Sequence, residues 1–318
     1  MKPLHSLAVF ALIIAAPSLA EPRSPAIENE ILVGESLPGA FYATPEGKGP
    51  FPAIILLGGS EGGDRGARSL APQFLEAGYA VLGLPYYSPA WGDRPQQFPG
   101  LPRAFANIPV EMAGKAKDWL AARPDVRGAD IAIYGVSKGA ELALLAGSRI
   151  DGFAAIAAIA PSDVVWEGWG TGDGTRPSSF SWQGEPLPFV PYEGMEEEFA
   201  NPTGPSGRPR LRLPHDKGRN ANPDRAVAAR IAVESIDEPV LVAGGDADLV
   251  WNSGEMAQAI AERRAAANLP TVSLVFTDAG HALSGTGATN ERRAEADLAA
   301  QRKIWPATLE FMARHLKD

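Results

Sequence analysis

Residues 131–145 restrict the fold of this chain more than any other stretch. They open with the apolar, β-branched run of a buried strand and end in a helix-forming run. Between the two lies G-V-S-K-G at residues 135–139, which matches G-x-S-x-G. A strand before this pattern and a helix after it predict a sharp turn that strains the serine backbone and exposes its hydroxyl at the head of the helix. We therefore predict that Ser137 is a nucleophile; the alternative is a serine that only caps the helix.

The G-x-S-x-G pattern occurs a second time, at residues 58–62, in a different context. With 34 glycines in 318 residues, one chance match would be unsurprising. Gly63, Asp64 and Gly66 follow the second match, so no helix is expected to start directly after Ser60. Only Ser137 has the flanks of a nucleophile turn.

Strand-like and helix-like segments alternate along most of the chain. An antiparallel pair is expected at 30–44, and the expected buried strands are 53–57, 79–84, 131–136, 153–160, 240–243 and 272–276. The expected helices are 68–77, 110–123, the run after Ser137, 253–268 and a C-terminal helix that Pro306 starts or kinks. This alternation predicts an α/β fold, with a mostly parallel sheet covered by helices on both faces. We expect residues 21–318 to form one domain.

Residues 161–225 break the alternation, with many Gly, Pro and Trp and little periodicity. We interpret them as a cap inserted into the domain, because long insertions in compact domains are usually functional. The aromatic residues of this cap either cover an acyl or aromatic group of the substrate or form the cap's own small core. The basic residues within 207–225 either attract an anionic substrate or form a solvated surface.

A serine hydroxyl is a weak nucleophile and needs a base, usually a histidine held by a carboxylate. The chain has four histidines. His5 lies in the N-terminal leader, His215 in the irregular cap, and His315 off the apolar stripe of the last helix. His281 directly follows the last expected strand, and ligand sites in parallel sheets lie at the carboxyl ends of strands. We therefore predict that His281 is the base.

The carboxylate is also expected after a strand, and residues 244–251 (G-G-D-A-D-L-V-W) follow the strand at 240–243. Asp248 is our choice and Asp246 the alternative, whose other role would be to cap the turn. The order Ser, Asp, His along the chain agrees with an α/β-hydrolase.

Attack on a carbonyl creates an oxyanion, which backbone N–H groups stabilise. One donor should be the N–H of Lys138, the residue after the nucleophile. The other should come from the glycine-rich loop at 58–63; we predict Ser60, with Gly59 or Glu61 as alternatives.

The N-terminus and the composition indicate the compartment. Lys2, the apolar run 7–16 and small residues at 18 and 20 predict a signal peptide over residues 1–20, cleaved before Glu21. The apolar run is shorter than the ~20 residues of a membrane span, so we predict a periplasmic or secreted protein with no membrane span. The chain has no cysteine, which excludes disulfides and thiolate metal sites. A net charge of −9 argues against nucleic acid as a partner.

Several segments together resemble one known family. The matching segments are 49–52 (G-P-F-P), 57–59 (L-G-G), 78–82 (G-Y-A-V-L), 84–87 (L-P-Y-Y), 124–128 (P-D-V-R-G), 135–143 (G-V-S-K-G-A-E-L-A), 184–188 (G-E-P-L-P), 245–251 (G-D-A-D-L-V-W) and 280–281 (G-H). They are similar to the C-terminal catalytic domain shared by acyl-CoA thioesterases and bile acid-CoA:amino acid N-acyltransferase, an α/β-hydrolase close to dienelactone hydrolases. The likeness spans residues 49–316, and the S-K-G-A-E run is its most specific part. The resemblance places the family's triad on Ser137, Asp248 and His281 and implies acyl transfer to water.

We therefore expect a serine hydrolase, with no cofactor and no metal, that cleaves a small acyl ester or acyl-CoA-type thioester through an acyl-enzyme on Ser137. One alternative is an acyltransferase that uses an amine or another acceptor. The other is a non-catalytic periplasmic binding protein that kept the fold.

Overall fold

In a computed structural model that describes residues 27, 29–90, 95–204, 207–283 and 291–317, strands and helices alternate along most of the chain. The predicted signal peptide lies outside the described residues. The strands are β1 (Ile31–Leu32), β2 (Phe41–Ala43), β3 (Phe51–Leu57), β4 (Ala80–Gly83), β5 (Ile108–Pro109), β6 (Val126–Val136), β7 (Ala155–Ile159), β8 (Phe180–Trp182), β9 (Glu185–Pro186), β10 (Val240–Gly245) and β11 (Thr271–Phe276). The helices are α1 (Arg65–Glu76), α2 (Glu111–Ala121), α3 (Lys138–Gly147), α4 (Met195–Ala200), α5 (Arg212–Ala221), α6 (Pro223–Ala228), the 3-10 helix η3 (Val233–Ser235), α7 (Ser253–Ala266) and α8 (Glu291–Leu316).

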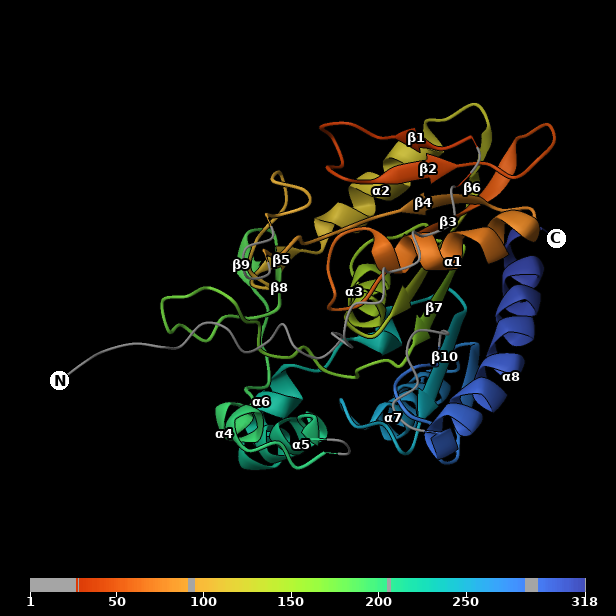
Figure 1. Ribbon diagram of the computed structural model, residues 1–318. Helices are drawn as coiled ribbons and strands as arrows, with labels where there is room; N and C mark the ends of the chain where they lie inside the picture. The colour runs from red at the N-terminus through yellow and green to blue at the C-terminus, as the bar shows by residue number, and fades with distance from the viewer. Residues whose placement is uncertain (1–26, 28, 91–94, 205–206, 284–290, 318) are drawn as a thin grey trace.

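Eight of these strands form one sheet, in the order β1-β2-β4-β3-β6-β7-β10-β11 (Figure 1). The pairs from β4 to β11 are all parallel, and only β1 with β2 and β2 with β4 are antiparallel. The predicted antiparallel pair and the predicted mostly parallel sheet are therefore confirmed. Parallel order brings the carboxyl ends of β3, β6, β10 and β11 to one edge of the sheet.

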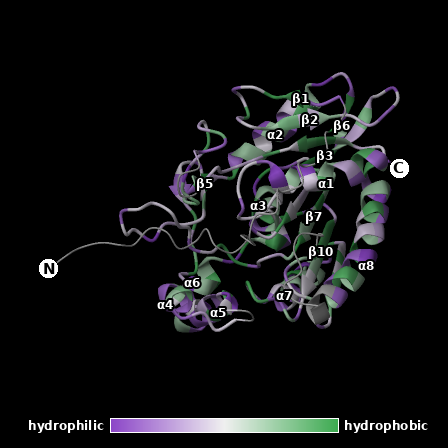
Figure 2. Ribbon diagram, viewed as in Figure 1, coloured by the Kyte–Doolittle hydropathy of each residue, from purple (hydrophilic) through white to green (hydrophobic). Residues whose placement is uncertain are grey.

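Alternate residues of the central strands pack against different helices, as a period of two requires. In β3, Ile55 and Leu57 belong to a cluster with residues of α2, α3 and α7, whereas Ile54 and Leu56 belong to one with residues of α1 and α8. None of these four residues is exposed. Burial on both faces explains the unbroken apolar run of this strand. Figure 2 shows the central strands as mostly hydrophobic.

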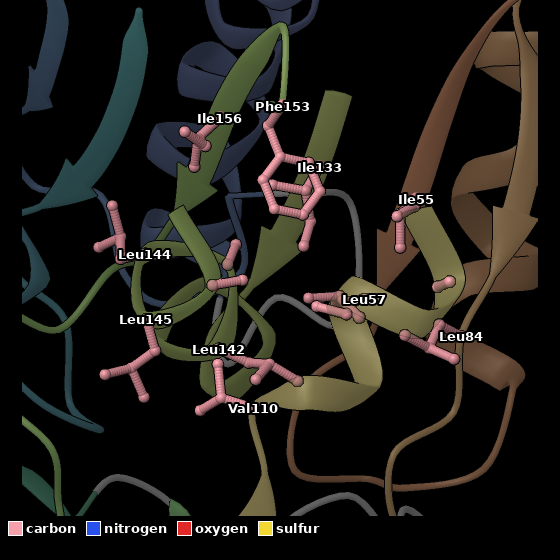
Figure 3. Close-up of a cluster of buried hydrophobic side chains, with 14 of the residues drawn as sticks. Ile55, Leu57, Leu84, Val110, Ile133, Leu142, Leu144, Leu145, Phe153 and Ile156 are labelled. Carbon is pink, nitrogen blue, oxygen red and sulfur yellow. The ribbon is translucent and has the colours of Figure 1, made fainter. Parts of the chain in front are cut away.

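Helix α3, which directly follows Ser137, is buried on every side. All of its residues, from Lys138 to Gly147, are buried. Its leucines at 142, 144 and 145 lie in one cluster with Ile133 and Ile156 of the neighbouring strands (Figure 3). A helix buried all round is usually apolar all round, so the charged side chains in its first turn need partners inside the protein.

Residues 160–239, between β7 and β10, form a segment that we call the insertion. It contains β8, β9, α4, α5, α6 and η3, and β8 joins β5 and β9 in a second, three-stranded sheet. The three helices lie together to one side of the large sheet (Figure 1). Helices of six to ten residues are too short to give a clear apolar period, which is why the sequence of this region predicts no regular elements.

The insertion has an apolar core of its own. Trp166 and Tyr192 stack with ring centroids 6.0 Å apart, in a cluster that also contains Trp251 from the loop after β10. Trp166 and Tyr192 therefore form part of the insertion's own core, which is one of the two roles expected for its aromatic residues. The cluster also joins the insertion to the loop that carries the predicted carboxylates.

Of the two roles expected for Pro306, starting or kinking the C-terminal helix, the structure excludes the first. Helix α8 runs from Glu291 to Leu316, with Pro306 inside it, so the proline does not start the helix. Ala300 and Ile304, before the proline, are buried in the cluster on the α1 side of the sheet, and this packing extends the helix toward its N-terminus. No helix among the described residues is long and apolar enough to cross a bilayer.

Candidate active site

Ser137 lies in the turn between β6 and α3 and has a strained backbone. Its φ of 57° and ψ of −121° are rare for a residue with a side chain. The flanking glycines make the turn possible. A Cβ on Gly135 would lie 2.1 Å from the carbonyl oxygen of Gly139, and one on Gly139 would lie 2.2 Å from that of Gly58. The structure thus has the strand, the turn and the helix that the G-x-S-x-G motif predicts.

His281 lies in the loop after β11 and faces the serine. Its Nε2 is 2.8 Å from the Ser137 hydroxyl, and its Nδ1 is 2.7 Å from Oδ2 of Asp248. When Nδ1–H donates to the Asp248 carboxylate, Nε2 is the ring nitrogen that accepts from the serine O–H. The structure therefore brings together the three side chains chosen from the sequence, in an arrangement that can transfer a proton from hydroxyl to imidazole.

Asp248 is fully buried, and both of its carboxylate oxygens accept hydrogen bonds. Besides His281, Oδ2 accepts from the hydroxyl of Ser253 at 2.6 Å, and Oδ1 accepts from the N–H of Val250 at 2.8 Å. Asp246 instead accepts from the N–H of Asp278 and does not contact the imidazole. Of the two alternatives, Asp248 is the one that holds the histidine. The sequence analysis did not identify Ser253, the first residue of α7, as a partner of Asp248. The sequence signal for this role is the position of Ser253 directly after the carboxylate loop.

An aromatic ring also packs against the imidazole of His281. The ring of Trp251 meets that of His281 edge to face, with centroids 5.0 Å apart and planes at 88°. The indole N–H donates to the carbonyl of Pro161, the second residue of the insertion, at 2.9 Å. The position of the histidine ring is therefore linked to the start of the insertion.

The glycine-rich loop after β3 lies against the serine. A Cβ on Gly59 would be 3.3 Å from the Cβ of Ser137, so the loop backbone approaches the nucleophile closely. The N–H of Gly59 donates to Oε1 of Glu61 at 2.9 Å, which occupies this alternative oxyanion donor. Burial raises the pKa of the Glu61 carboxyl. Of the two predicted oxyanion donors, Ser60 directly follows Gly59 in this loop, and Lys138 directly follows Ser137 as the first residue of α3.

Two tyrosines of the L-P-Y-Y segment hydrogen-bond to the glycine-rich loop. The sequence analysis did not assign this role to them. The hydroxyl of Tyr86 lies 2.8 Å from the carbonyl oxygen of Gly58 and 2.9 Å from that of Gly59. The hydroxyl of Tyr87 donates to the carbonyl of Ser60 at 2.6 Å. The loop therefore has fixed carbonyl directions, and with them fixed directions for the neighbouring N–H groups.

The other histidines have different environments. His215 is buried on α5, where its Nδ1–H donates to the carbonyl of Leu211 at 2.8 Å. Burial lowers its pKa to about 3, so the ring is neutral near pH 7. Its Nε2 has no hydrogen-bond partner among the described residues. His315 packs against Phe311 of its own helix, and His5 lies outside the described residues.

Part of the basic stretch is used inside the protein. Arg219 makes two hydrogen bonds to the buried Asp163, at 2.6 and 2.8 Å, and Arg225 lies over the ring of Phe189. Arg212 donates to the carbonyl of Asp246 at 3.0 Å. These three side chains therefore hold the insertion together or attach it to the carboxylate loop.

Comparison with known proteins gives both a family and a fold. The sequence profile of the family described as BAAT / Acyl-CoA thioester hydrolase C terminal matches residues 108–285. Human acyl-coenzyme A thioesterase 1 is 30% identical over 135 residues, which cover 42% of this chain and 29% of the thioesterase. Mouse acyl-coenzyme A thioesterase 5 is 35% identical over 131 residues, which cover 41% of this chain and 28% of the thioesterase.

The chain therefore spans less than a third of the length of these curated relatives. Among solved structures, the α/β-hydrolase GrgF from Penicillium sp. sh18 superposes with a TM-score of 0.53 at 17% identity and covers 88% of this chain and 94% of its own. At that identity the likeness shows the fold alone, and it confirms the α/β-hydrolase architecture.

Proposed function

Since the chain belongs to the BAAT / acyl-CoA thioester hydrolase C-terminal family, we propose that it is a serine hydrolase that cleaves an acyl ester or an acyl-CoA-type thioester through an acyl-enzyme on Ser137. The observation that carries the proposal is the line of contacts from the Ser137 hydroxyl through His281 to Asp248, at 2.8 and 2.7 Å. A hydroxyl, an imidazole and a buried carboxylate in this order form the arrangement that activates a serine.

The first half of the reaction acylates the enzyme. His281 Nε2 takes the hydroxyl proton while Oγ of Ser137 attacks the substrate carbonyl carbon. The negative charge that forms on the carbonyl oxygen is stabilised by the N–H groups of Lys138 and Ser60, and each such donor contributes roughly 10²- to 10³-fold to the rate. When the tetrahedral intermediate collapses, the alcohol or thiol leaves with the proton from the imidazolium. Asp248 stabilises the imidazolium and holds its tautomer.

The second half releases the acyl group. A water molecule gives a proton to His281 and attacks the acyl carbon, and the same two N–H groups stabilise the second oxyanion. Collapse returns the proton to Oγ and frees the carboxylic acid. The protein begins and ends the cycle in the same state, so the mechanism needs no cofactor.

Acyl transfer is the second candidate function, because the family description includes BAAT as well as thioester hydrolases. Transfer would use the same acyl-enzyme, with an amine or another acceptor in place of water. The two reactions separate when the products are analysed with competing acceptors: hydrolysis gives the free acid, and transfer gives the amide or ester.

Serine-directed labelling tests the proposed function. A fluorophosphonate probe should label the wild-type protein, and Ser137→Ala should abolish labelling and lower turnover of p-nitrophenyl esters or acyl-CoA thioesters by roughly 10⁴-fold or more. The matched control is Ser60→Ala in the second G-x-S-x-G segment, which keeps its backbone N–H and should keep its labelling. Labelling of Ser137→Ala at the wild-type rate would exclude the proposal, and tight binding of an acyl compound without turnover would favour a binding protein.

We also propose that residues 1–20 direct export and are removed, which places the hydrolase in the periplasm or outside the cell. The basic start and short apolar run of this segment support the proposal. N-terminal sequencing of the protein from the periplasmic fraction should begin at Glu21, and an intact N-terminus in the cytoplasmic fraction would exclude it.

A further inference from the structure

A buried ion pair follows the nucleophile directly. Lys138 and Glu141 lie in the first turn of α3, where the Lys138 Nζ is 2.7 Å from Oε2 of Glu141. The side chains are 2% and 0% exposed. Burial lowers the pKa of Lys138 and raises that of Glu141, and the charge of each partner opposes the shift of the other. No step of the mechanism above uses either side chain.

Among the described residues, the other side-chain hydrogen bonds of the pair go to the insertion. Lys138 Nζ donates to the hydroxyl of Ser179 at 2.9 Å, and that hydroxyl donates to the carbonyl of Glu167 at 3.0 Å. Oε1 of Glu141 accepts from the backbone N–H of Trp166 at 3.1 Å. The first turn of α3 is therefore tied to two separate parts of the insertion.

Aromatic rings complete the surroundings of the ammonium group. Lys138 Nζ lies 5.3 Å from the ring centroid of Phe105, 5.8 Å from that of Trp169 and 5.6 Å from that of Phe180. Two of these rings belong to the insertion, and Trp169 stacks on Phe105 at 4.3 Å. Cations are attracted to aromatic faces at such distances, so the insertion holds the lysine side chain by its rings as well as by Ser179.

Stability alone does not explain such a pair. Taking two charges out of water is costly, and apolar replacements of buried ion pairs are often neutral or stabilising. What distinguishes Lys138 is its backbone, because its N–H is the donor that the proposed mechanism requires. Oxyanion donors work only within a narrow range of distances, and a displacement of about 1 Å can cost about 100-fold in rate.

We propose that the Lys138–Glu141 pair positions the backbone N–H of Lys138, the proposed oxyanion donor. The pair binds the insertion through both side chains and thereby holds the first turn of α3, and with it this N–H, in place. This inference rests on the proposed function. The Lys138 and Glu141 side chains do not touch the substrate; they act through the backbone of residue 138.

The test removes both charges together. Lys138→Met or Glu141→Gln alone leaves one charge buried without its partner, so each single variant should lower the melting temperature. The double variant Lys138→Met/Glu141→Gln has no unpaired charge and should regain most of the wild-type melting temperature. Its Ser137 should nevertheless react with the fluorophosphonate about tenfold or more slowly than that of the wild type. In ester turnover kcat should fall while KM stays nearly unchanged, because an interaction made only in the transition state is weakened.

The control is an ion pair within the insertion, between the buried Asp163 and the partly exposed Arg219. Among the described residues, this pair makes no hydrogen bond to α3, so the double variant Asp163→Asn/Arg219→Met should react with the probe within about twofold of the wild-type rate. All rates are normalised to the fraction of protein that the probe labels to completion, which corrects for unfolded material.

A Lys138→Met/Glu141→Gln variant that the probe labels at the wild-type rate would overturn the inference and leave the pair with a packing role only. So would an equal loss of rate in both double variants. Failure of the proposed function gives a different result, because the wild-type protein itself would then carry no label on Ser137.

Discussion

At the scale of single residues, the position of the oxyanion loop depends on phenol groups as well as on glycines. The glycines of the loop after β3 let the backbone approach Ser137, but they also leave it conformationally free. The hydroxyl groups of Tyr86 and Tyr87 remove that freedom by binding three consecutive carbonyls, at residues 58, 59 and 60. A hydrogen bond of this kind contributes only about 1 kcal/mol to stability, yet its effect on a donor's position can be larger.

Tyr87→Phe should therefore lower kcat about five- to tenfold with little change in KM, because it deletes the 2.6 Å hydrogen bond to the carbonyl of Ser60. Steady-state kinetics with a p-nitrophenyl ester measure this change. Tyr79→Phe is the matched control: the Tyr79 hydroxyl is buried without a hydrogen-bond partner among the described residues, so activity should be unchanged. Equal kinetics for Tyr87→Phe and wild type would show that the glycine-rich loop keeps its shape without the brace.

At the scale of elements, α5 attaches the insertion to the carboxylate loop. Arg212, at the start of this helix, donates to the carbonyls of Asp246 and Asp248. One turn later His215 packs among the rings of Trp166, Tyr192 and Trp251. The last of these rings also contacts the catalytic imidazole proposed here, so α5 and the active-site loop share one packed cluster.

The buried histidine of α5 makes this docking sensitive to acid. The pKa of His215 is about 3 in the folded protein and about 6.5 when unfolded. Between pH 3 and pH 6.5 the unfolded state binds more protons at His215 than the folded state does. The contribution of the neutral His215 ring to folding stability is therefore full above about pH 6.5 and falls as the pH drops toward 3. Between pH 7 and pH 5 the wild type should lose about 2 kcal/mol of unfolding free energy that His215→Leu does not lose.

Urea unfolding at pH 7 and pH 5 measures this difference. His315→Leu keeps the buried histidine and should show the wild-type loss. If the two histidine variants and the wild type all lose the same free energy of unfolding, the buried ring of His215 contributes nothing to acid sensitivity.

At the scale of the whole molecule, the two faces of the sheet are covered by different helices, and aromatic residues join the layers. On the face covered by α1 and α8, Phe74 of α1 contacts Tyr134 of β6 at 5.2 Å and Trp305 of α8 at 5.5 Å between ring centroids. One side chain thus links α1, the strand that leads to the nucleophile and α8. We expect it to be among the most important residues for global stability.

Phe74→Ala should lower the free energy of unfolding by about 3–5 kcal/mol, because it removes a large buried ring from between three elements. Leu32→Ala, at a side chain that is 73% exposed, should change it by less than about 0.5 kcal/mol. Both values come from urea unfolding at pH 7. A loss below about 1 kcal/mol for Phe74→Ala would mean that the layers are held together elsewhere.

Much of the large sheet and the core of the site could be predicted from the sequence, because the signals are local. A strand buried on both faces needs an unbroken apolar run, and a strained serine needs glycines at residues 135 and 139. Histidine was rare enough for elimination to select His281, which contacts Ser137 in the structure. The insertion could not be predicted in this way. Its helices are short, and α5 buries Pro214, His215 and Gly218, residues that carry no apolar pattern.

The sequence by itself determined the α/β order, the turn at Ser137 and the serine and histidine that meet there, since each depends on residue type and on neighbours in the chain. Only the tertiary structure decided between Asp246 and Asp248, because a turn can present either carboxylate and only the packing of α7 and the histidine loop selects one. The structure likewise decided that α8 runs through Pro306 and that Lys138 and Glu141 pair inside the protein. These features depend on contacts between segments far apart in the chain, and no local pattern encodes them.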